Sequence, residues 1–282
     1  MKIGIVGMGL MGGSFGRALV KKGYTVYGFD LSDEVMLKCE LLHAFTAPLT
    51  KDNAGEVDLL IAAVNPSKFE KAIAPFLPLL KRGATVSDFC GVKRVIAKVM
   101  RELSDKFTDL NFIGAHPMAG REYSGIEHSS ITLFEKASMI LVPVKADIFT
   151  IDAVKEFYLS VGFSRVVITD ANHHDGVIAY TSQLCHIVSN AFILNNQAEN
   201  RLGYSAGSFR DLTRVARMNP ELWTELIALN SDNALKELDE LINNLNKYRN
   251  AIAEKDYETL SRLFSAGNDR KIRIEQGKTD NV

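Results

Sequence analysis

A glycine-rich turn near the start of the chain constrains its fold more than any other feature. The stretch G-I-V-G-M-G-L-M-G places Gly7, Gly9 and Gly12 in G-x-G-x-x-G spacing, directly after the apolar run Lys2–Val6. A strand that enters such a turn and a helix that leaves it are typical of a dinucleotide-binding βαβ unit. The first glycine permits the tight turn, the second lets a pyrophosphate approach the backbone, and the third lets helix and strand pack closely.

The residues around this turn indicate which dinucleotide binds. Leu10 and Met11 lie inside the fingerprint, where a helix N-terminus presents free amides to the phosphates. Asp30 closes the second expected strand, and a carboxylate there accepts hydrogen bonds from ribose hydroxyls and repels a 2′-phosphate. The cofactor is therefore predicted to be NAD. Asn65 and Pro66 follow a third strand and fit the adenosine side of the cofactor, but a plain strand-to-helix turn explains them equally well.

The hydrophobic pattern changes once, near residue 169. Before it, short β-type runs alternate with helical ones, which predicts a parallel sheet with helices on both sides. After it, the pattern is helical throughout. The fold class is therefore α/β, with a Rossmann-type NAD-binding domain at 1–169 and an all-helical domain at 170–282. The expected strands are 2–6, 25–29, 59–64, 84–87, 111–115, 138–144 and 165–169, and the expected helices include 14–22, 66–80, 170–200, 208–218 and 256–266.

Net charge and cysteine usage exclude several classes of protein. The net charge of -1 provides no basic excess for nucleic-acid binding. Cys39, Cys90 and Cys185 lack paired spacing, which argues against a disulfide framework or a zinc-thiolate site and favours a reducing compartment. No stretch is apolar enough for a membrane span, and the chain begins with a strand instead of a signal peptide. We expect a cytoplasmic protein that binds neither nucleic acid nor membrane.

His116 is the first candidate for chemistry. It lies in F-I-G-A-H-P-M-A-G-R-E-Y-S-G, at the C-terminal end of an expected strand, where open α/β sheets bind ligands. A lone histidine is more often structural. However, small neighbours such as Gly114 and Ala119 would let a ligand come close, and removing hydride from a carbinol requires a base for the hydroxyl proton. We interpret His116 as that base.

The succession of motifs resembles one enzyme family. After the glycine turn come D-F-C-G-V-K, H-P-M-A-G-R-E-Y-S-G, H-H-D-G-V-I-A-Y-T-S-Q-L-C-H and F-R-D-L-T-R-V-A-R-M-N-P-E-L-W. This order resembles the prephenate/arogenate dehydrogenase family over about residues 2 to 230. The glycine turn is generic, whereas the H-P-M-A-G motif and the D-L-T-R motif with its later P-x-x-W are much more specific.

The resemblance implies a role for each matching residue. His116 matches the histidine that hydrogen bonds the ring 4-hydroxyl and takes its proton as hydride leaves C4. Arg214 matches an arginine that binds a substrate carboxylate. Asp211 lies three residues earlier on the same helix face and would hold that guanidinium, although a surface ion pair explains the two equally well without the family match. The other substrate-binding matches are Glu122, His186 and Trp223.

Two positions depart from the family pattern. Many members carry serine just before Val-Lys, where it helps to hold the 4-hydroxyl, and this chain has Gly91 there. Either a water, Ser87 or another group takes that role, or the base works with less orientation. Arg121 stands where many members have threonine. It could contact a substrate carboxylate, but solvation or a pair with Glu122 fits better.

His173, His174 and Asp175 open the longest expected helix. Metal ligands must converge, and adjacent side chains on a helix diverge. We therefore interpret these residues as helix-start structure and predict no metal site.

The sequence thus predicts NAD-dependent oxidative decarboxylation of prephenate to 4-hydroxyphenylpyruvate, a step in tyrosine biosynthesis. The same chemistry on arogenate is the nearest alternative. A 3-hydroxyacid dehydrogenase would need a lysine on the helical domain, and the chain has none between Lys155 and Lys236. A non-catalytic NAD-sensing module would need neither His116 nor Arg214.

A leucine-rich stripe runs from Leu222 to Leu245 at near-helical spacing. It exceeds what a small bundle must bury, which predicts a homodimer through the helical domains, as in the family. The alternative is that these leucines pack wholly within one protomer.

Overall fold

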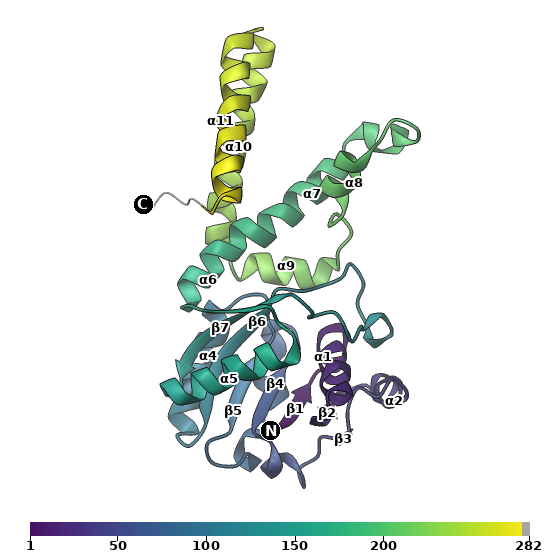
Figure 1. The fold of residues 1–282 in the computed structure, drawn as a ribbon, viewed down its shortest axis with the longest axis vertical. Coiled ribbons are helices and arrows are strands. Elements are labelled where there is room, and N and C mark those ends of the chain that lie inside the picture. The colour runs from purple at the N-terminus through teal and green to yellow at the C-terminus, as the bar shows by residue number, and fades with distance from the viewer. Residues whose placement is uncertain (278–282) are drawn as a thin grey trace. The chain divides into compact units, whose positions relative to one another are not determined.

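A sheet of eight strands organises the N-terminal part of the chain (Figure 1). The computed structural model describes residues 1–277. The strands lie in the order β3-β2-β1-β4-β5-β6-β7-β8, so the chain starts inside the sheet and builds outward in both directions. They are β1 (Lys2–Val6), β2 (Thr25–Phe29), β3 (Ala47–Pro48), β4 (Leu59–Ala62), β5 (Thr85–Asp88), β6 (Asn111–Pro117), β7 (Ser138–Lys145) and β8 (Arg165–Ile168).

Every neighbouring pair of strands is parallel except β6 and β7, where the expectation of a parallel sheet is wrong. Parallel neighbours need a crossover connection, usually a helix. Residues 118–137, which join β6 to β7, hold only the short 3-10 turn Ile126–His128, so the chain returns antiparallel. The next connection runs through α5 (Ile148–Val161), and β8 pairs parallel with β7.

Helices cover both faces of the sheet because its central strands bury both of their faces (Figure 1). Besides α5, they are α1 (Leu10–Lys21), α2 (Asp33–Leu41), α3 (Phe69–Ile73) and α4 (Arg94–Lys106). Ile5 of β1 belongs to one apolar cluster with Phe15 of α1 and Tyr158 of α5. The next residue, Val6, belongs to a second cluster with Ile96 of α4. This alternation follows from the two-residue repeat of a strand, and it places the glycine turn after the buried residues 3–6 of β1.

The stretch 66–80 forms three short pieces instead of the expected helix. A 3-10 turn at Pro66–Lys68 leads into α3, and a second one follows at Leu77–Leu79. Pro75 and Pro78 explain the break, because proline donates no backbone hydrogen bond and its ring clashes with the preceding helical turn. Accordingly, α3 ends before the first of these prolines.

The expected helix 170–200 is shorter and interrupted. Asp170 caps its start as predicted, since its Oδ1 accepts hydrogen bonds from the amides of Asn172 and His173. The chain then forms α6 (Ala171–Ile178), a π-helical segment (Ala179–Leu184), α7 (Cys185–Ile193), α8 (Gly207–Thr213) and α9 (Pro220–Ala228). Proline at the first position and an Asn219 side-chain cap start α9.

Grouped by compactness, the chain forms two units, Met1–Ser231 and Asp232–Val282. The second contains α10 (Ser231–Ala253) apart from its first residue, and α11 (Tyr257–Glu275), which extends beyond the expected end at 266. The rings of Tyr248 and Phe264 pack 5.4 Å apart between these helices. The expected boundary at 169, where the hydrophobic period of the sequence changes, stays a prediction. Residues 278–282 of the expected helical domain lie outside the described residues.

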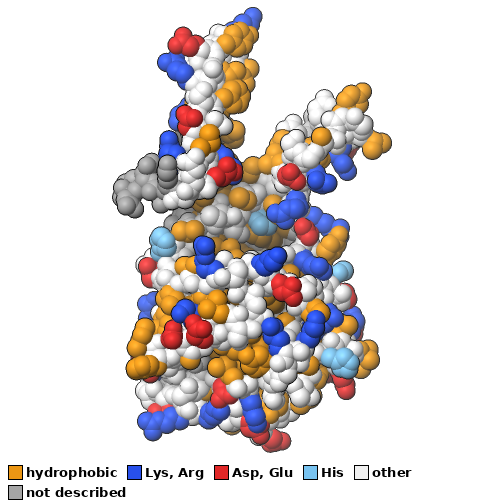
Figure 2. Space-filling view, viewed as in Figure 1, with side chains coloured by type: hydrophobic (Ala, Val, Ile, Leu, Met, Phe, Trp, Pro, Cys, Tyr) orange, Lys and Arg blue, Asp and Glu red, His pale blue; other side chains and the backbone are white. Residues whose placement is uncertain are grey.

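The leucine-rich stripe is only partly buried within the described chain. Leu226 of α9 is 8% exposed, whereas Leu235 and Leu245 of α10 are 58% and 57% exposed. Figure 2 shows apolar side chains gathered along one side of the α10–α11 hairpin. Among residues 1–277, no helix is both long enough and apolar enough to span a membrane.

Candidate active site

The glycine turn has the geometry that a dinucleotide pyrophosphate requires. Gly7 has a φ of +90°, and a Cβ there would lie 2.6 Å from the carbonyl oxygen of Ala63. A Cβ at Gly12 would overlap the carbonyl oxygen of Gly7. At Gly9, by contrast, a Cβ would meet no described atom within 4 Å. Packing therefore requires the first and third glycines, and the second leaves the backbone open to a ligand.

The N-terminus of α1 adjoins this open backbone. Leu10 and Met11 lie in its first turn, which contains no acidic residue. Gly9 is the cap residue, and it has no side chain that could hydrogen bond the first amides of the helix. The unpaired amides of a helix N-terminus attract anions. The residues present thus fit the phosphates of a dinucleotide.

Asp30 is held at the end of β2 with both carboxylate oxygens engaged. Its Oδ2 accepts a hydrogen bond of 2.8 Å from the amide of Met8, and its Oδ1 accepts one of 3.0 Å from the amide of Ser32. The first bond ties the carboxylate to the glycine turn. The acidic group and the phosphate-binding backbone therefore keep a fixed spacing, which fits a ribose-binding aspartate.

Asn65 and Pro66 lie in the loop after β4, and this loop is bound by α9. The Asn65 side-chain amide donates to Glu225 Oε2 at 3.2 Å, and the amide of Ser67 donates to Glu225 Oε1 at 2.7 Å. Pro66 is buried at the start of its 3-10 turn. The loop thus has a structural partner, and a cofactor contact at Asn65 would be an additional role.

His116 is the second-to-last residue of β6, and its ring is hydrogen bonded to a buried histidine of α6. Its Nδ1 is 2.9 Å from Nε2 of His174, and Nδ1 of His174 is 2.7 Å from Oδ1 of Asp175. His174 and Asp175 are 2% and 0% exposed, whereas His116 is partly exposed. His116 is therefore the member of this chain of hydrogen bonds that a substrate can reach.

Asp175 is fixed by donors from several elements. Its Oδ1 accepts from the amide of Lys93 at 2.7 Å, and its Oδ2 accepts from the amide of Arg94 at 2.9 Å. The Asn230 side chain donates to the Asp175 carbonyl oxygen at 2.8 Å. Burial alone would raise the pKa of Asp175, but the hydrogen bonds from His174 and from these two amides bring it below its ordinary value. Asp175 is therefore ionised at neutral pH.

A buried ion pair lies beneath the histidines. Lys93 Nζ donates to Asp88 Oδ2 at 2.6 Å, and both side chains are inaccessible to solvent. The same Asp88 carboxylate accepts from the amide of Ala115, the residue before His116. Burial holds the pKa of His116 well below its usual range, and the Lys93 ammonium and His174 act in the same direction. His116 is consequently neutral at neutral pH, as a general base must be.

A second cluster contains His186 of α7 and Trp223 of α9. Their rings stack with centroids 3.7 Å apart and planes 28° apart. His186 Nδ1 donates to the carbonyl oxygen of Ser182 at 2.9 Å. Burial lowers the pKa of His186, and the charge of Arg214 lowers it further. Three predicted substrate-binding residues, His186, Trp223 and Arg214, therefore lie in one region.

Arg214 pairs with Glu122 rather than with Asp211. Its Nη1 lies 3.9 Å from Glu122 Oε1, and its side chain is 68% exposed. Asp211 instead lies 3.9 Å from Arg210 Nε, and both of those side chains are exposed. The expected Asp211–Arg214 pair is thus absent among the described contacts. Arg121 does not pair with Glu122, since its Nη1 donates to the carbonyl oxygen of His128 at 3.2 Å.

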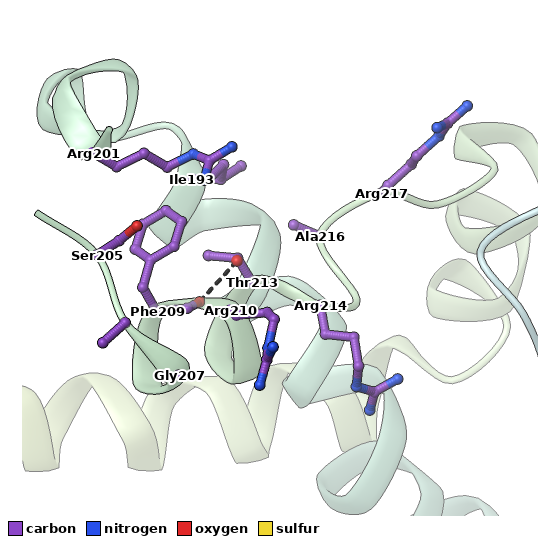
Figure 3. A pocket seen from close by; sticks show the side chains of 11 residues that line it. Ile193, Arg201, Ser205, Gly207, Phe209, Arg210, Thr213, Arg214, Ala216 and Arg217 are labelled. Atoms are coloured by element: carbon purple, nitrogen blue, oxygen red, sulfur yellow. Dashed lines mark hydrogen bonds between the residues drawn. The ribbon is translucent and has the colours of Figure 1, made fainter. Parts of the chain in front are cut away.

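A pocket of about 820 Å³ lies beside α8 and the end of α7 (Figure 3). Four arginines contribute to its lining: Arg201, Arg210, Arg214 and Arg217. Figure 3 shows that Arg210 and Arg214 extend in the same direction, away from Arg201. His116, His174 and His186 do not line this pocket. It therefore adjoins Arg214 and not His116.

The sequence did not reveal the residues that surround His116. His174 and Asp175 were assigned to the start of a helix, yet their side chains meet His116 across 58 residues of sequence. Adjacent histidine and aspartate before a long helix were the available signal. Ser87, suggested as a substitute for the family serine, is fully buried and unavailable to a substrate. A Cβ at Gly91 would lie 3.2 Å from Leu226 Cδ1, so α9 occupies that space.

No group of three or more potential metal ligands converges among residues 1–277. All three cysteines are free thiols, and Cys39 and Cys90 are buried.

Two protein-family models match the chain. The nucleotide-binding domain of prephenate dehydrogenase matches residues 15–167, and the dimerization domain of prephenate dehydrogenase matches residues 170–266.

Whole-chain relatives point the same way. The cyclohexadienyl dehydrogenase of Zymomonas mobilis is 31% identical, and the alignment covers 99% of this chain and 96% of that protein. The prephenate dehydrogenase of Bacillus subtilis is 28% identical, and the alignment covers 94% of this chain and 74% of that protein. Among solved structures, the prephenate dehydrogenase of Aquifex aeolicus, in complex with hydroxyphenyl propionate and NAD+, has a TM-score of 0.83 at 27% identity. That match covers 97% of this chain and 98% of the other.

Proposed function

Because this chain belongs to the prephenate dehydrogenase family, we propose that it oxidatively decarboxylates prephenate to 4-hydroxyphenylpyruvate, a step towards tyrosine. It is an NAD-dependent oxidoreductase with a Rossmann-type fold. One observation carries the choice of reaction. His116 lies near the C-terminal end of β6, at the sheet edge where β1 enters the glycine turn, and it is neutral and partly exposed.

The reaction needs one base and one hydride acceptor. NAD, when bound, accepts the hydride that leaves C4. His116 takes the proton of the 4-hydroxyl, so the carbon–oxygen bond becomes a carbonyl. The ring carboxylate then leaves as CO₂ and its bonding electrons enter the ring. The phenolate oxygen so formed takes up a proton, and His116 returns to its neutral form when it supplies that proton.

Substrate recognition is assigned to the second cluster. The Arg214 guanidinium is accessible and can bind both oxygens of a carboxylate. Glu122 lies beside it and would orient it. The stacked rings of His186 and Trp223 offer a flat, half-buried surface for the substrate ring. Asp211 faces Arg210 in this structure, so its role in binding substrate stays a prediction.

The cofactor is assigned to the N-terminal domain, 1–169. Gly7, Gly9 and Gly12, with the amides of Leu10 and Met11, would hold the pyrophosphate. Asp30 would bind the adenosine ribose and favour NAD over NADP, and Asn65 and Pro66 would border the adenosine. The helical domain, 170–282, is assigned to the substrate and to dimerisation.

Dimerisation follows from the exposed apolar residues of the helical domain. The matched dimerization domain covers residues 170–266, and Leu235 and Leu245 expose more than half of their surface. We propose that a second copy of the chain covers them, which gives a homodimer.

The three free thiols suit a reducing compartment, and we therefore place the enzyme in the cytoplasm.

The test is an assay of nicotinamide reduction on the native chain. Prephenate and arogenate are each offered with NAD and with NADP. We expect turnover of prephenate with NAD. Turnover of arogenate alone would assign the chain as an arogenate dehydrogenase. The chemistry at C4 would be the same. Binding of NAD without turnover of either compound would contradict the enzyme assignment and favour an NAD-sensing role.

A further inference from the structure

We infer that His174 and Asp175 are positioning residues that hold His116 as the tautomer with a free Nε2, the atom that accepts the proton. The inference rests on the proposed function for the identity of the proton donor. The tautomer of His116 is a property of the protein alone, so this part of the inference is independent of the proposed function. The three residues come from β6 and the start of α6, so the folded chain, rather than the substrate, sets the protonation pattern.

The direction of each hydrogen bond follows from the carboxylate. An ionised carboxylate can only accept. Asp175 Oδ1, 2.7 Å from His174 Nδ1, therefore requires a proton on that nitrogen. A neutral His174 then has an unprotonated Nε2, which must accept from Nδ1 of His116 at 2.9 Å. His116 consequently carries its own proton on Nδ1, and its Nε2 has a free lone pair.

Burial and the Lys93 ammonium favour the neutral form of both rings, and at His174 they outweigh the carboxylates of Asp175 and Asp88. Lys93 lies at the turn before α4 with its ammonium buried against Asp88, and Arg94 contacts Asp175 from the start of α4. Burial lowers the pKa of His174, although its hydrogen bond to Asp175 acts in the opposite direction. If His174 were protonated, both of its nitrogens would donate. His116 would then have to accept at Nδ1 and carry its proton on Nε2, where it could not act as a base.

Gly91 makes this arrangement the main source of orientation for the base. The family serine at this position would contribute a hydroxyl, but here the space is filled by the side chain of Leu226. Among the described residues, His174 is the only group hydrogen bonded to the ring of His116. Loss of His174 should therefore release the His116 ring without removing the base itself.

The direct test is nitrogen NMR of the histidine rings in the full-length protein near neutral pH. In the native protein we expect His116 to show a protonated Nδ1 and an unprotonated Nε2. In His174→Leu we expect a mixture of both tautomers. In His174→Gln the amide oxygen can still accept from His116, and the native pattern should largely return. Native His116 with its proton on Nε2 would overturn the inference.

Kinetics separate positioning from folding. We expect kcat of His174→Leu to fall about 10- to 100-fold, which is less than the roughly 10²–10⁴-fold that a general base contributes in full. KM and NAD affinity should stay near native, and His174→Gln should recover most of the rate. His173→Leu is the matched control, because this neighbouring histidine is exposed and should turn over normally.

Failure of the inference and failure of the proposed function are distinguishable. A folded, NAD-binding His174→Leu variant with native kcat would show that His174 does not position the base. If the native chain turns over neither prephenate nor arogenate, while the tautomer of His116 is as expected and changes in His174→Leu, the hydrogen-bond chain is supported and the reaction assignment is wrong.

Discussion

His116 and Arg214 carry the two halves of the proposed reaction, and the chain holds them in opposite ways. His116 is hydrogen bonded to a buried histidine, which is hydrogen bonded to a buried aspartate fixed by two backbone amides. Arg214 is 68% exposed and its described ion pair, with Glu122, is 3.9 Å long. The folded chain thus fixes the proposed proton acceptor before substrate arrives, whereas the proposed carboxylate-binding group is accessible and would be organised by the substrate.

The difference has a physical reason. A base acts on one atom and gains from a fixed lone pair, so orientation in the free protein contributes directly to the rate. A buried guanidinium without a partner would be costly before substrate binds, because a charge removed from water needs compensation. An exposed arginine avoids that cost. The two halves should therefore respond differently to mutation, one through kcat and the other through KM.

The largest expected effect is that of His116→Asn. Loss of the proton acceptor should lower kcat by about 10²–10⁴-fold, with little change in NAD affinity, because the base is not part of the glycine turn. Steady-state assays and an NAD titration measure the two quantities. His43→Asn is the control, since His43 is exposed and asparagine tolerates its φ of 52°. Near-native turnover by His116→Asn would contradict the assignment of His116 as the proton acceptor.

Arg214→Ala should raise KM for the substrate about 10- to 100-fold, the range expected for a lost charged hydrogen bond, and change kcat less. Arg210→Ala is the matched control. It lines the same pocket four residues earlier, but its ion pair is with Asp211. If both variants raise KM equally, the positive charge of the pocket as a whole, and not Arg214, attracts the substrate.

The pH dependence of stability tests, without substrate, whether the histidines of the site are held neutral in the folded protein. The pKa values of His116, His174 and His186 are lowered on folding from an ordinary value of 6.5. Below pH 6.5 the unfolded chain therefore binds more protons than the folded one, and the free energy of unfolding should fall as pH falls. Each such proton contributes a slope of up to about 1.4 kcal/mol per pH unit.

Denaturant titrations between pH 7.5 and pH 5 would measure that slope, with the His174→Leu variant alongside. The variant lacks one of the three histidines, so its stability should depend less on pH. Equal slopes for the two proteins would mean that His174 is not held neutral in the folded state.

Gly91→Ser should give the smallest effect. Its Cβ would lie 3.2 Å from Leu226 Cδ1, so α9 must shift slightly, and we expect a loss of about 1 kcal/mol in unfolding free energy. Chemical denaturation measures it. Gly120→Ser is the control, because a Cβ there meets no described atom within 4 Å and the residue is exposed. An unchanged stability for Gly91→Ser would mean that α9 moves freely at this contact.

Local patterns in the sequence predicted local structure well. The strands Lys2–Val6 and Thr25–Phe29 and the cap at Asp170 are found where they were expected, because each is set by neighbours within a few residues. The break at 66–80 was missed although Pro75 and Pro78 signal it. The antiparallel β7 was missed because strand direction depends on what connects the strands, and alternation alone does not report it.

Contacts between distant residues could not be predicted in this way. The bond between His116 and His174 joins positions 58 residues apart, and the place of His174 at a helix start suggested a structural role instead. Asp211 was chosen as the partner of Arg214 by helix spacing, yet Glu122 from another segment lies closer to it. The family resemblance pointed to these side chains one by one, but only the fold shows which of them meet.

The π-helical segment Ala179–Leu184 separates Asp175 from His186 along one continuous helical path. Such a segment accommodates an extra residue in an otherwise regular helix. Each residue turns a helix by about 100°, so deleting one residue of α6 after Asp175 would rotate His186 relative to Asp175. Deleting one residue inside the π-helical segment would instead remove the extra residue and leave the direction of His186 nearly unchanged. Tolerance to a one-residue deletion therefore differs between the π-helical segment and the α-helix that precedes it, although the two form one helical path.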